Sequence, residues 1–181
     1  MKRLCGVNKN IDNISFAKLS ELKVLKSERV PSLRQVLELV NNQVPILVEV
    51  KNDKLRNADL HEMVLKELKA YKGQYAVQSF HPSTVSFFLS ELDVPVGLLS
   101  CSYRNEDMNF FKKEILRNNL SVFAKKPDFV SYQWDELNGL VNQILHQKLE
   151  IPFIAWTLKS EYEVLQLSNF CHNYIFENFL P

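Results

Sequence analysis

The sequence has few glycines, only four in 181 residues, and neither glycine-rich phosphate loop, GxGxxG or GxxxxGK[ST], is present. Their absence excludes the common nucleotide-binding turns. The three cysteines are odd in number, far apart and without CxxC spacing, so we expect reduced thiols rather than a disulfide framework or a zinc site. The four histidines, His61, His81, His146 and His172, show no HExxH spacing and match no catalytic motif.

Charge and hydropathy exclude two further classes of function. The chain carries 22 basic and 21 acidic residues, and no basic stripe with interleaved aromatics appears, so nucleic acid is not an expected partner. No apolar run approaches the roughly 18 residues of a membrane-spanning helix, and the N-terminus "MKRLCGVNKNIDN" has no apolar signal-peptide core. With 46% hydrophobic residues, we expect one globular domain over residues 1–181, located in the cytoplasm.

Helix-like and strand-like stretches alternate along the chain. Apolar spacing predicts helices over 30–43, 57–71, 81–92, 105–120, 135–148 and 160–170, and strands over 45–50, 75–80, 94–100, 128–132, 151–158 and 173–179. Short strands that alternate with helices predict βαβ units and a parallel sheet. The strand body "PILVEV" is apolar except for its glutamate, which is typical of a parallel strand buried on both faces.

Polar and aromatic residues gather where the predicted strands end. These residues are Glu49 and Lys51, Ser79 and Phe80, Ser100, Tyr132, Trp156 and Thr157, and Glu177 and Asn178. In folds with parallel strands the ligand binds at the carboxyl ends of the strands. We therefore expect a pocket at this edge of the sheet.

Glu49 and Lys51 lie two residues apart on one strand, so their side chains point the same way. One interpretation is a plain salt bridge at the mouth of a barrel. The other is a carboxylate that holds a hard cation, Mg²⁺ or Ca²⁺, beside a lysine that faces an anionic substrate such as a phosphate. Glu177 allows the same two interpretations, a second acid at the mouth or a solvated side chain.

Phe80 and Trp156 suit either the core or the wall of a pocket, because aromatic residues at strand ends commonly line ligand sites. Ser79 is not expected to act as a nucleophile, since no GxSxG turn surrounds it.

Several stretches resemble the glycerophosphodiester phosphodiesterase family. "VPSLRQVLELVNNQVPILVEVKN" is similar to the family segment in which a "(I/V)P(T/S)L" helix start leads into a strand that ends "(I/V)E(I/L/V)K". "VQSFHP" resembles the family's next strand, "AWTL" resembles its "(A/W)WTV" strand, and "NYIFENFLP" resembles its terminal strand. The stretch "KRLCGVNKNIDNISFAKLSELKVL" also resembles a family segment, and the order of these stretches matches along the whole chain.

The resemblance implies a (β/α)₈ TIM barrel and a phosphoric diester hydrolase. Such an enzyme hydrolyses glycerophosphodiesters to glycerol 3-phosphate and an alcohol, with a divalent cation, Mg²⁺ or Ca²⁺, as cofactor. Glu49 would be a metal ligand and Lys51 the lysine on the phosphate side. Ser79, Phe80 and Trp156 would contribute to binding the substrate.

The sequence departs from the family at its start. The family has upstream segments with "HRG", "PENT", "E.D" and "HD", which supply the two catalytic histidines and two further metal-binding acids, and none is present here. No catalytic residue is therefore expected within these residues. We expect a partial phosphodiesterase domain, a barrel truncated to about six βα units without its first two strands, and self-association through exposed strand edges.

Three hypotheses remain open from the sequence. The chain is an incomplete phosphodiesterase, or it is a catalytically inactive barrel that serves in binding or assembly. The third is an unrelated α/β binding protein in which Glu49 and Lys51 form a structural pair.

Overall fold

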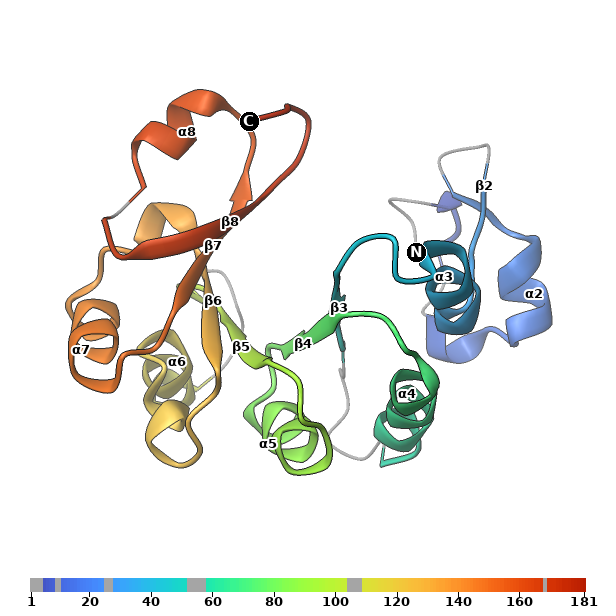
Figure 1. Cartoon of the computed structure of the whole chain (residues 1–181), viewed down its shortest axis with the longest axis horizontal. Helices are drawn as coiled ribbons and strands as arrows, with labels where there is room; N and C mark the ends of the chain where they lie inside the picture. Colours follow the sequence, from blue (N-terminus) through green and yellow to red (C-terminus); the bar gives the residue numbers. More distant parts are fainter. Residues whose placement is uncertain (1–4, 9–10, 25–27, 52–57, 104–108, 168) are drawn as a thin grey trace. The chain divides into compact units, whose positions relative to one another are not determined.

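The computed structural model describes residues 5–8, 11–24, 28–51, 58–103, 109–167 and 169–181 (Figure 1). The chain divides into two compact units, one of Met1–Val44 with Ala70–Gly73 and one of Pro45–Lys69 with Gln74–Pro181. We expected one domain over residues 1–181, and that these two units form one domain stays a prediction.

The first unit holds short elements around one well-capped helix. Its elements are η1 (Ile11–Asn13), α2 (Phe16–Glu21), β1 (Lys23–Val24), β2 (Glu28–Arg29) and α3 (Leu33–Val40). The side chain of Ser32 accepts a hydrogen bond from the backbone N–H of Gln35 at 3.2 Å, and the Gln35 side chain accepts one from the Ser32 N–H at 2.8 Å. This capping box satisfies two N–H groups that the helix leaves unpaired, and it fixes where α3 begins.

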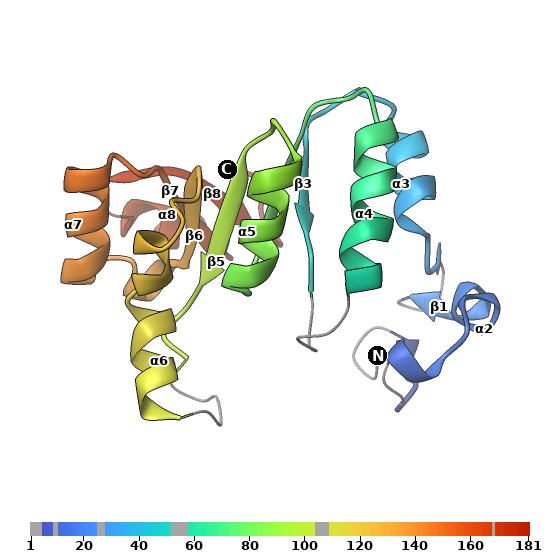
Figure 2. The same ribbon diagram turned by 90° about the horizontal axis from the view of Figure 1, so that it is seen from below.

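The second unit contains six strands and the helices between them. Its elements are β3 (Ile46–Glu49), α4 (Ala58–Ala70), β4 (Tyr75–Ser79), α5 (Pro82–Glu91), β5 (Val96–Ser100), α6 (Phe110–Arg117), η2 (Leu120–Phe123), β6 (Phe129–Gln133), η3 (Trp134–Glu136), α7 (Leu140–Leu149), β7 (Phe153–Leu158), α8 (Glu161–Leu165) and β8 (Cys171–Phe176). The strands form one sheet in the order β3-β4-β5-β6-β7-β8, and every pair is parallel. The sheet curls, with helices along its convex side (Figures 1 and 2). The predicted α/β class with parallel strands of the TIM-barrel type is confirmed.

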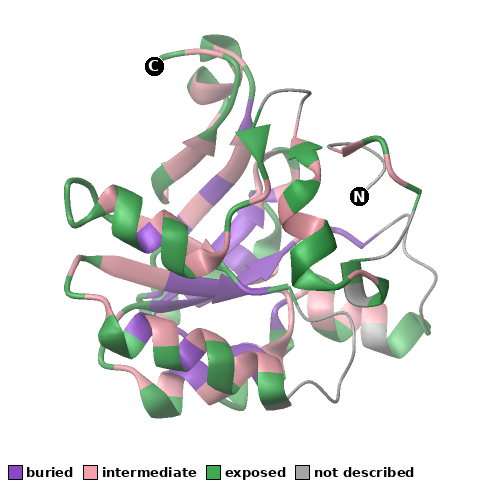
Figure 3. Cartoon of the chain, turned by 90° about the vertical axis from the view of Figure 1, so that its right-hand side faces the viewer, coloured by how far each residue is buried: buried purple, intermediate pink, exposed green. Residues whose placement is uncertain are grey.

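The convex face of the sheet forms most of the core. Val77, Leu98 and Val130 are between 0% and 4% exposed, and the register places them on the same face. Phe88 of α5 and Leu145 of α7 are also almost fully buried. Figure 3 shows the same distribution, with buried strands inside and helices that are exposed on their outer sides. Burial of these aliphatic side chains is the main stabilising term of the second unit.

Two hydrogen bonds fasten α6 to this face. The hydroxyl groups of Ser100 and Tyr132 donate to the carbonyl oxygens of Leu116 and Arg117, at 3.0 and 2.9 Å. Burial, with a smaller contribution from Glu136, raises the pKa of Tyr132 to about 12. The phenol therefore stays protonated near neutral pH and remains a donor.

The expectation that the first strand of this sheet is buried on both faces is wrong. Leu47 in β3 is 38% exposed, and residues along the strand alternate between half-buried and exposed. Among the described residues β3 pairs only with β4, so one of its sides lacks the neighbouring strand that would cover it. An apolar run predicts a strand, but it does not show whether the strand lies at the centre or at the edge of a sheet.

The helix expected over 135–148 begins later than predicted. Trp134–Glu136 forms a 3-10 turn, and α7 starts at Leu140 with Gly139 as its N-cap. Gly139 thus lies before the helix, where it costs little, and not inside it. The helix expected over 105–120 begins at Phe110, and residues 105–108 of that prediction lie outside the described residues.

Gly97 provides a test of the sheet's close packing. A Cβ atom at this position would fall on the ring of Phe129 from the neighbouring strand. We expect Gly97→Ala to lower the free energy of unfolding by about 1–3 kcal/mol, the cost of overpacking a well-filled interior. Chemical denaturation measures the free energy of unfolding. Gly139→Ala is the control, because the nearest atom to a Cβ at position 139 would be 3.8 Å away. Equal stability of Gly97→Ala and wild type would contradict the packing.

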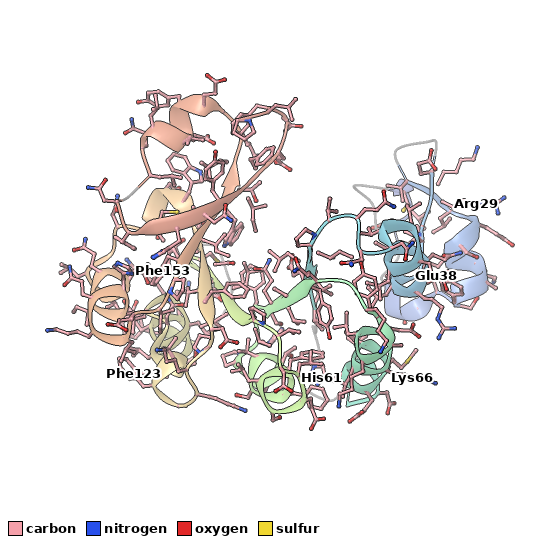
Figure 4. The ribbon with its side chains drawn as sticks, viewed as in Figure 1. Arg29, Glu38, His61, Lys66, Phe123 and Phe153 are labelled. Atoms are coloured by element: carbon pink, nitrogen blue, oxygen red, sulfur yellow. The ribbon has the colours of Figure 1, made fainter. Side chains whose placement is uncertain are left out.

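The contact between α4 and α5 carries a titratable group. The His61 ring stacks on Phe87 with centroids 5.0 Å apart, and its Nε2 lies 3.0 Å from the hydroxyl oxygen of Thr84 (Figure 4). Burial lowers the pKa of His61 below 6.5, Glu62 opposes this shift and His81 adds to it. The folded protein therefore disfavours the imidazolium relative to the unfolded chain.

We accordingly expect stability to fall as the pH drops below about 6.5, where the unfolded chain binds the proton more readily than the folded one. The contribution of His61 is fully present above the unfolded pKa and is lost as the pH falls toward the lower folded pKa. Denaturation at pH 7 and pH 5 should show a smaller difference for His61→Gln than for wild type. Glu62→Gln should enlarge the difference, because it removes the charge that favours the imidazolium. A difference unchanged in both variants would disprove this role of His61.

Candidate functional site

Glu49 and Lys51 lie at the carboxyl end of β3. The Oε1 atom of Glu49 is 3.6 Å from Nζ of Lys51, and the side chains are 31% and 75% exposed, respectively. The glutamate is thus neither buried alone nor fully solvated. An ion pair this exposed contributes at most about 1 kcal/mol to stability, so both groups remain available to a ligand.

A polar bridge lies beside Glu49 on the concave face of the sheet. Gln78 is the residue of β4 that pairs with Glu49, and its side-chain oxygen accepts a hydrogen bond from the hydroxyl of Ser131 at 2.7 Å. Gln78 and Ser131 come from β4 and β6, with β5 between them, so this hydrogen bond spans a strand. In β5, Gly97 pairs with Gln78 on one side and with Phe129 on the other, and Leu99 pairs with Ser131.

Sequence reasoning missed Gln78 and Ser131. Each is a polar residue inside an apolar strand, and both are buried, at 4% and 0% exposure. A buried polar side chain needs a partner, so a polar position within "YAVQS" and "FVSY" is a detectable signal. The sequence does not show that the two are partners, since 53 residues separate them.

Phe80 and Trp156 contact each other at the carboxyl edge, and their role in binding substrate stays a prediction. Their ring centroids are 5.7 Å apart in an edge-on arrangement, and Tyr103 contacts Phe80 at 6.4 Å. Both side chains are half-buried. Within the described residues the buried indole Nε1 of Trp156 has no hydrogen-bond partner. The three rings therefore form an apolar wall, and the indole N–H of Trp156 within it has no acceptor among the described residues.

Ser79 lies on the other face of the sheet. It is 1% exposed, its hydroxyl donates to the carbonyl oxygen of Val50 at 2.7 Å, and the His81 N–H donates to the same hydroxyl at 3.3 Å. Since neighbouring strand residues alternate faces, Ser79 points away from the side of Gln78 and Glu49. These contacts join the ends of β3 and β4. The expected binding of substrate by Ser79 stays a prediction.

Glu177 follows β8 and pairs with Lys159, with Oε1 3.4 Å from Nζ. Both side chains are more than half exposed. Its backbone N–H donates to the carbonyl oxygen of Leu158 at 2.9 Å. Glu177 thus belongs to a second exposed ion pair, which joins the ends of β7 and β8.

The described residues do not by themselves fit a divalent-cation site. Among them no group of three or more His, Cys, Asp or Glu side chains is placed to hold a metal. Glu49 offers one carboxylate, whereas Mg²⁺ and Ca²⁺ take six or more oxygen ligands. The three cysteines are free thiols. In the part of the chain that the structure describes, no helix is long and apolar enough to cross a membrane.

Comparison with known proteins gives a structural relationship. No family model matches the chain, and no curated protein matches it either. A crystal structure from Agrobacterium tumefaciens, of a candidate glycerophosphoryl diester phosphodiesterase, superposes with a TM-score of 0.73. The match covers 96% of this chain and 71% of that one, at 13% sequence identity. The chain therefore shares the fold of that protein.

Proposed function

We propose that the chain binds a glycerophosphodiester at the carboxyl ends of β3 and β4, in a protein of the glycerophosphodiester phosphodiesterase type. The observation that carries this proposal is the Glu49–Lys51 pair. It lies at the strand edge that binds ligands in parallel α/β folds, in a sheet whose fold matches a candidate phosphodiesterase. The motifs that resemble the family support the same substrate class.

Charge and hydrogen bonding favour this ligand. The Lys51 ammonium is 75% exposed, and a lysine donates charge-assisted hydrogen bonds to phosphate oxygens. The Glu49 carboxylate accepts hydrogen bonds, which suits the hydroxyl groups of a glycerol moiety. Phe80 and Trp156 form an apolar wall for carbon atoms of the ligand.

Hydrolysis to glycerol 3-phosphate and an alcohol, with a divalent cation, is the activity that the family resemblance implies. A cation near the phosphate would neutralise charge on its oxygens. Glu49 is the ligand that this chain offers, and further oxygen ligands would have to come from outside the described residues. The free thiols of the chain are consistent with the cytoplasmic location that forms part of the proposal.

The second candidate function is binding or assembly without catalysis. It is favoured by the pairing of Glu49 with Lys51 and by the lack of a metal-holding cluster among the described residues. Strands β3 and β8 each pair on one side only in the sheet described here. Exposed edges of this kind are templates for pairing with another chain, so self-association belongs to this candidate.

Lys51→Ala tests the site. We expect it to weaken binding of glycerophosphocholine by about tenfold, the effect of losing one charge-assisted contact. Isothermal titration calorimetry measures the affinity. The control is Lys69→Ala, which breaks another exposed ion pair, between Nζ of Lys69 and Oε2 of Glu91 at 3.2 Å. Equal affinities for both variants and wild type would refute the proposed site.

Phosphorus NMR with added Mg²⁺ or Ca²⁺ separates the two candidate functions. The phosphodiesterase hypothesis predicts that a protein which carries this chain together with the family's two histidines releases glycerol 3-phosphate, and that Glu49→Gln abolishes the release. Binding that depends on Lys51, with no release by that protein at any concentration of either cation, would establish the non-catalytic alternative.

Ser79→Ala separates structural from ligand contacts at the same edge. The substitution leaves the buried Val50 carbonyl oxygen without its donor, so we expect the free energy of unfolding to fall by about 1–3 kcal/mol. Affinity for glycerophosphocholine tests the predicted contact with substrate: a purely structural hydroxyl, turned to the other face, leaves the affinity at the wild-type value. Urea denaturation gives the free energy of unfolding, and calorimetry on the same preparation gives the affinity. Weaker binding with unchanged stability would show instead that Ser79 contacts the ligand.

A further inference from the structure

The outer side of α6, η2 and α7 exposes an unusual number of large apolar side chains. The α6–α7 surface is defined by Phe110, Phe111, Ile115, Phe123, Leu140 and Ile144. Their exposed fractions range from 46% to 76%. Exposed hydrophobic side chains that cluster in one region mark interaction sites, whereas hydrophobic side chains scattered singly over a surface do not.

Local structure turns these residues outward. Asn109 caps α6 by accepting a hydrogen bond from the Phe111 N–H at 2.8 Å. Phe111 and Ile115 are four residues apart and therefore share one face of the helix. The rings of Phe110 and Phe111 contact each other edge-on, with centroids 5.9 Å apart. Since the backbone at Leu116 and Arg117 is bonded to the sheet, the end of α6 is held in place.

The two helices are joined by a buried hydrogen bond. The side-chain amide of Asn119, between α6 and η2, donates to the side-chain oxygen of Asn142 in α7 at 2.8 Å. Both residues are at most 3% exposed. Figures 1 and 2 both show α6 and α7 as near neighbours, and Figure 4 labels Phe123 on this side of the unit. The apolar residues therefore come from neighbouring elements of the second unit.

The segment of α6 and η2 also carries an excess of positive charge. Residues 109–127 contain five basic residues and one acidic residue, in a chain with 22 basic and 21 acidic residues. The acid, Glu114, pairs with Arg117 at 3.7 Å. Lys125 and Lys126 follow Phe123 after Ala124 and are both exposed, and Nζ of Lys125 donates a hydrogen bond to the carbonyl oxygen of Ser86 at 2.8 Å. Exposed phenylalanines next to basic side chains are typical of protein surfaces that lie on anionic membranes.

We propose that the α6–α7 surface binds the surface of an anionic lipid bilayer, with Phe111 and Phe123 inserted at the headgroup level. Lipid phosphates and acidic headgroups complement the basic residues, and the acyl boundary accepts the phenyl rings. A second copy of this chain is a poorer occupant, because its own basic residues would face those of the first. The inference stands on this surface alone and does not depend on the proposed phosphodiester site.

Co-sedimentation with vesicles tests the proposal. We expect the chain to bind vesicles of phosphatidylcholine with added phosphatidylserine, and to release them at high salt. Phe111→Ser should weaken binding by about tenfold, the factor for one aromatic side chain returned to water. Lys125→Glu with Lys126→Glu should weaken it by at least about tenfold, since each basic residue contributes about fivefold near such a surface.

Matched controls lie on α4. Met63 is 69% exposed and Lys66 is exposed (Figure 4). Met63→Ser removes a large apolar side chain and Lys66→Glu reverses one charge away from the α6–α7 surface, so both should leave binding unchanged. Circular dichroism confirms that the variants fold. The proposal is overturned if wild type ignores anionic vesicles, or if the control variants lose binding as the test variants do. Sedimentation of a dimer that Phe111→Ser dissociates, without vesicle binding, would identify a second copy as the occupant.

Discussion

The parallel register of β3 to β8 is the constraint on which the rest of the second unit depends. It pairs Glu49 with Gln78, and Gln78 with Gly97, so these positions share the concave face. The residues next to them, such as Val77 and Leu98, are turned toward the helices and buried. A slip of one residue would exchange the two sets and bury the charges. One register therefore sets both the core and the edge where a ligand can bind.

Gly97 has a particular role in this arrangement. It leaves room above β5 that the ring of Phe129 fills, and its partner in β4, Gln78, is hydrogen-bonded to Ser131 of β6. A buried amide and a buried hydroxyl would each cost free energy if they were left unpaired. Their mutual bond removes most of that cost and keeps the polar groups of the concave face in fixed positions next to Glu49.

The carboxyl edge and the outer helices combine two kinds of surface in one unit. Near Glu49 and Lys51 the charges are balanced and paired, and the apolar wall of Phe80 and Trp156 is partly covered. Along α6 and η2 the charges are mostly positive, and the phenyl rings are uncovered. The first kind of surface suits a small polar ligand, whereas the second suits a wide anionic one. A chain with nearly equal numbers of acids and bases can hold both only because the basic residues are concentrated locally.

The sequence by itself determined the alternation of strands and helices, because the apolar spacing of each element is local. It also determined that Glu49 lies at the end of β3 and that Lys51 and Phe80 lie just beyond strand ends, whereas Trp156 lies inside β7. Tertiary structure alone decided that Leu47 is exposed, since the position of a strand within its sheet is not encoded in its own run of residues. It also decided that Ser79 is turned to the opposite face and that Gln78 meets Ser131. These facts depend on strands that are distant in sequence and come together only when the sheet forms.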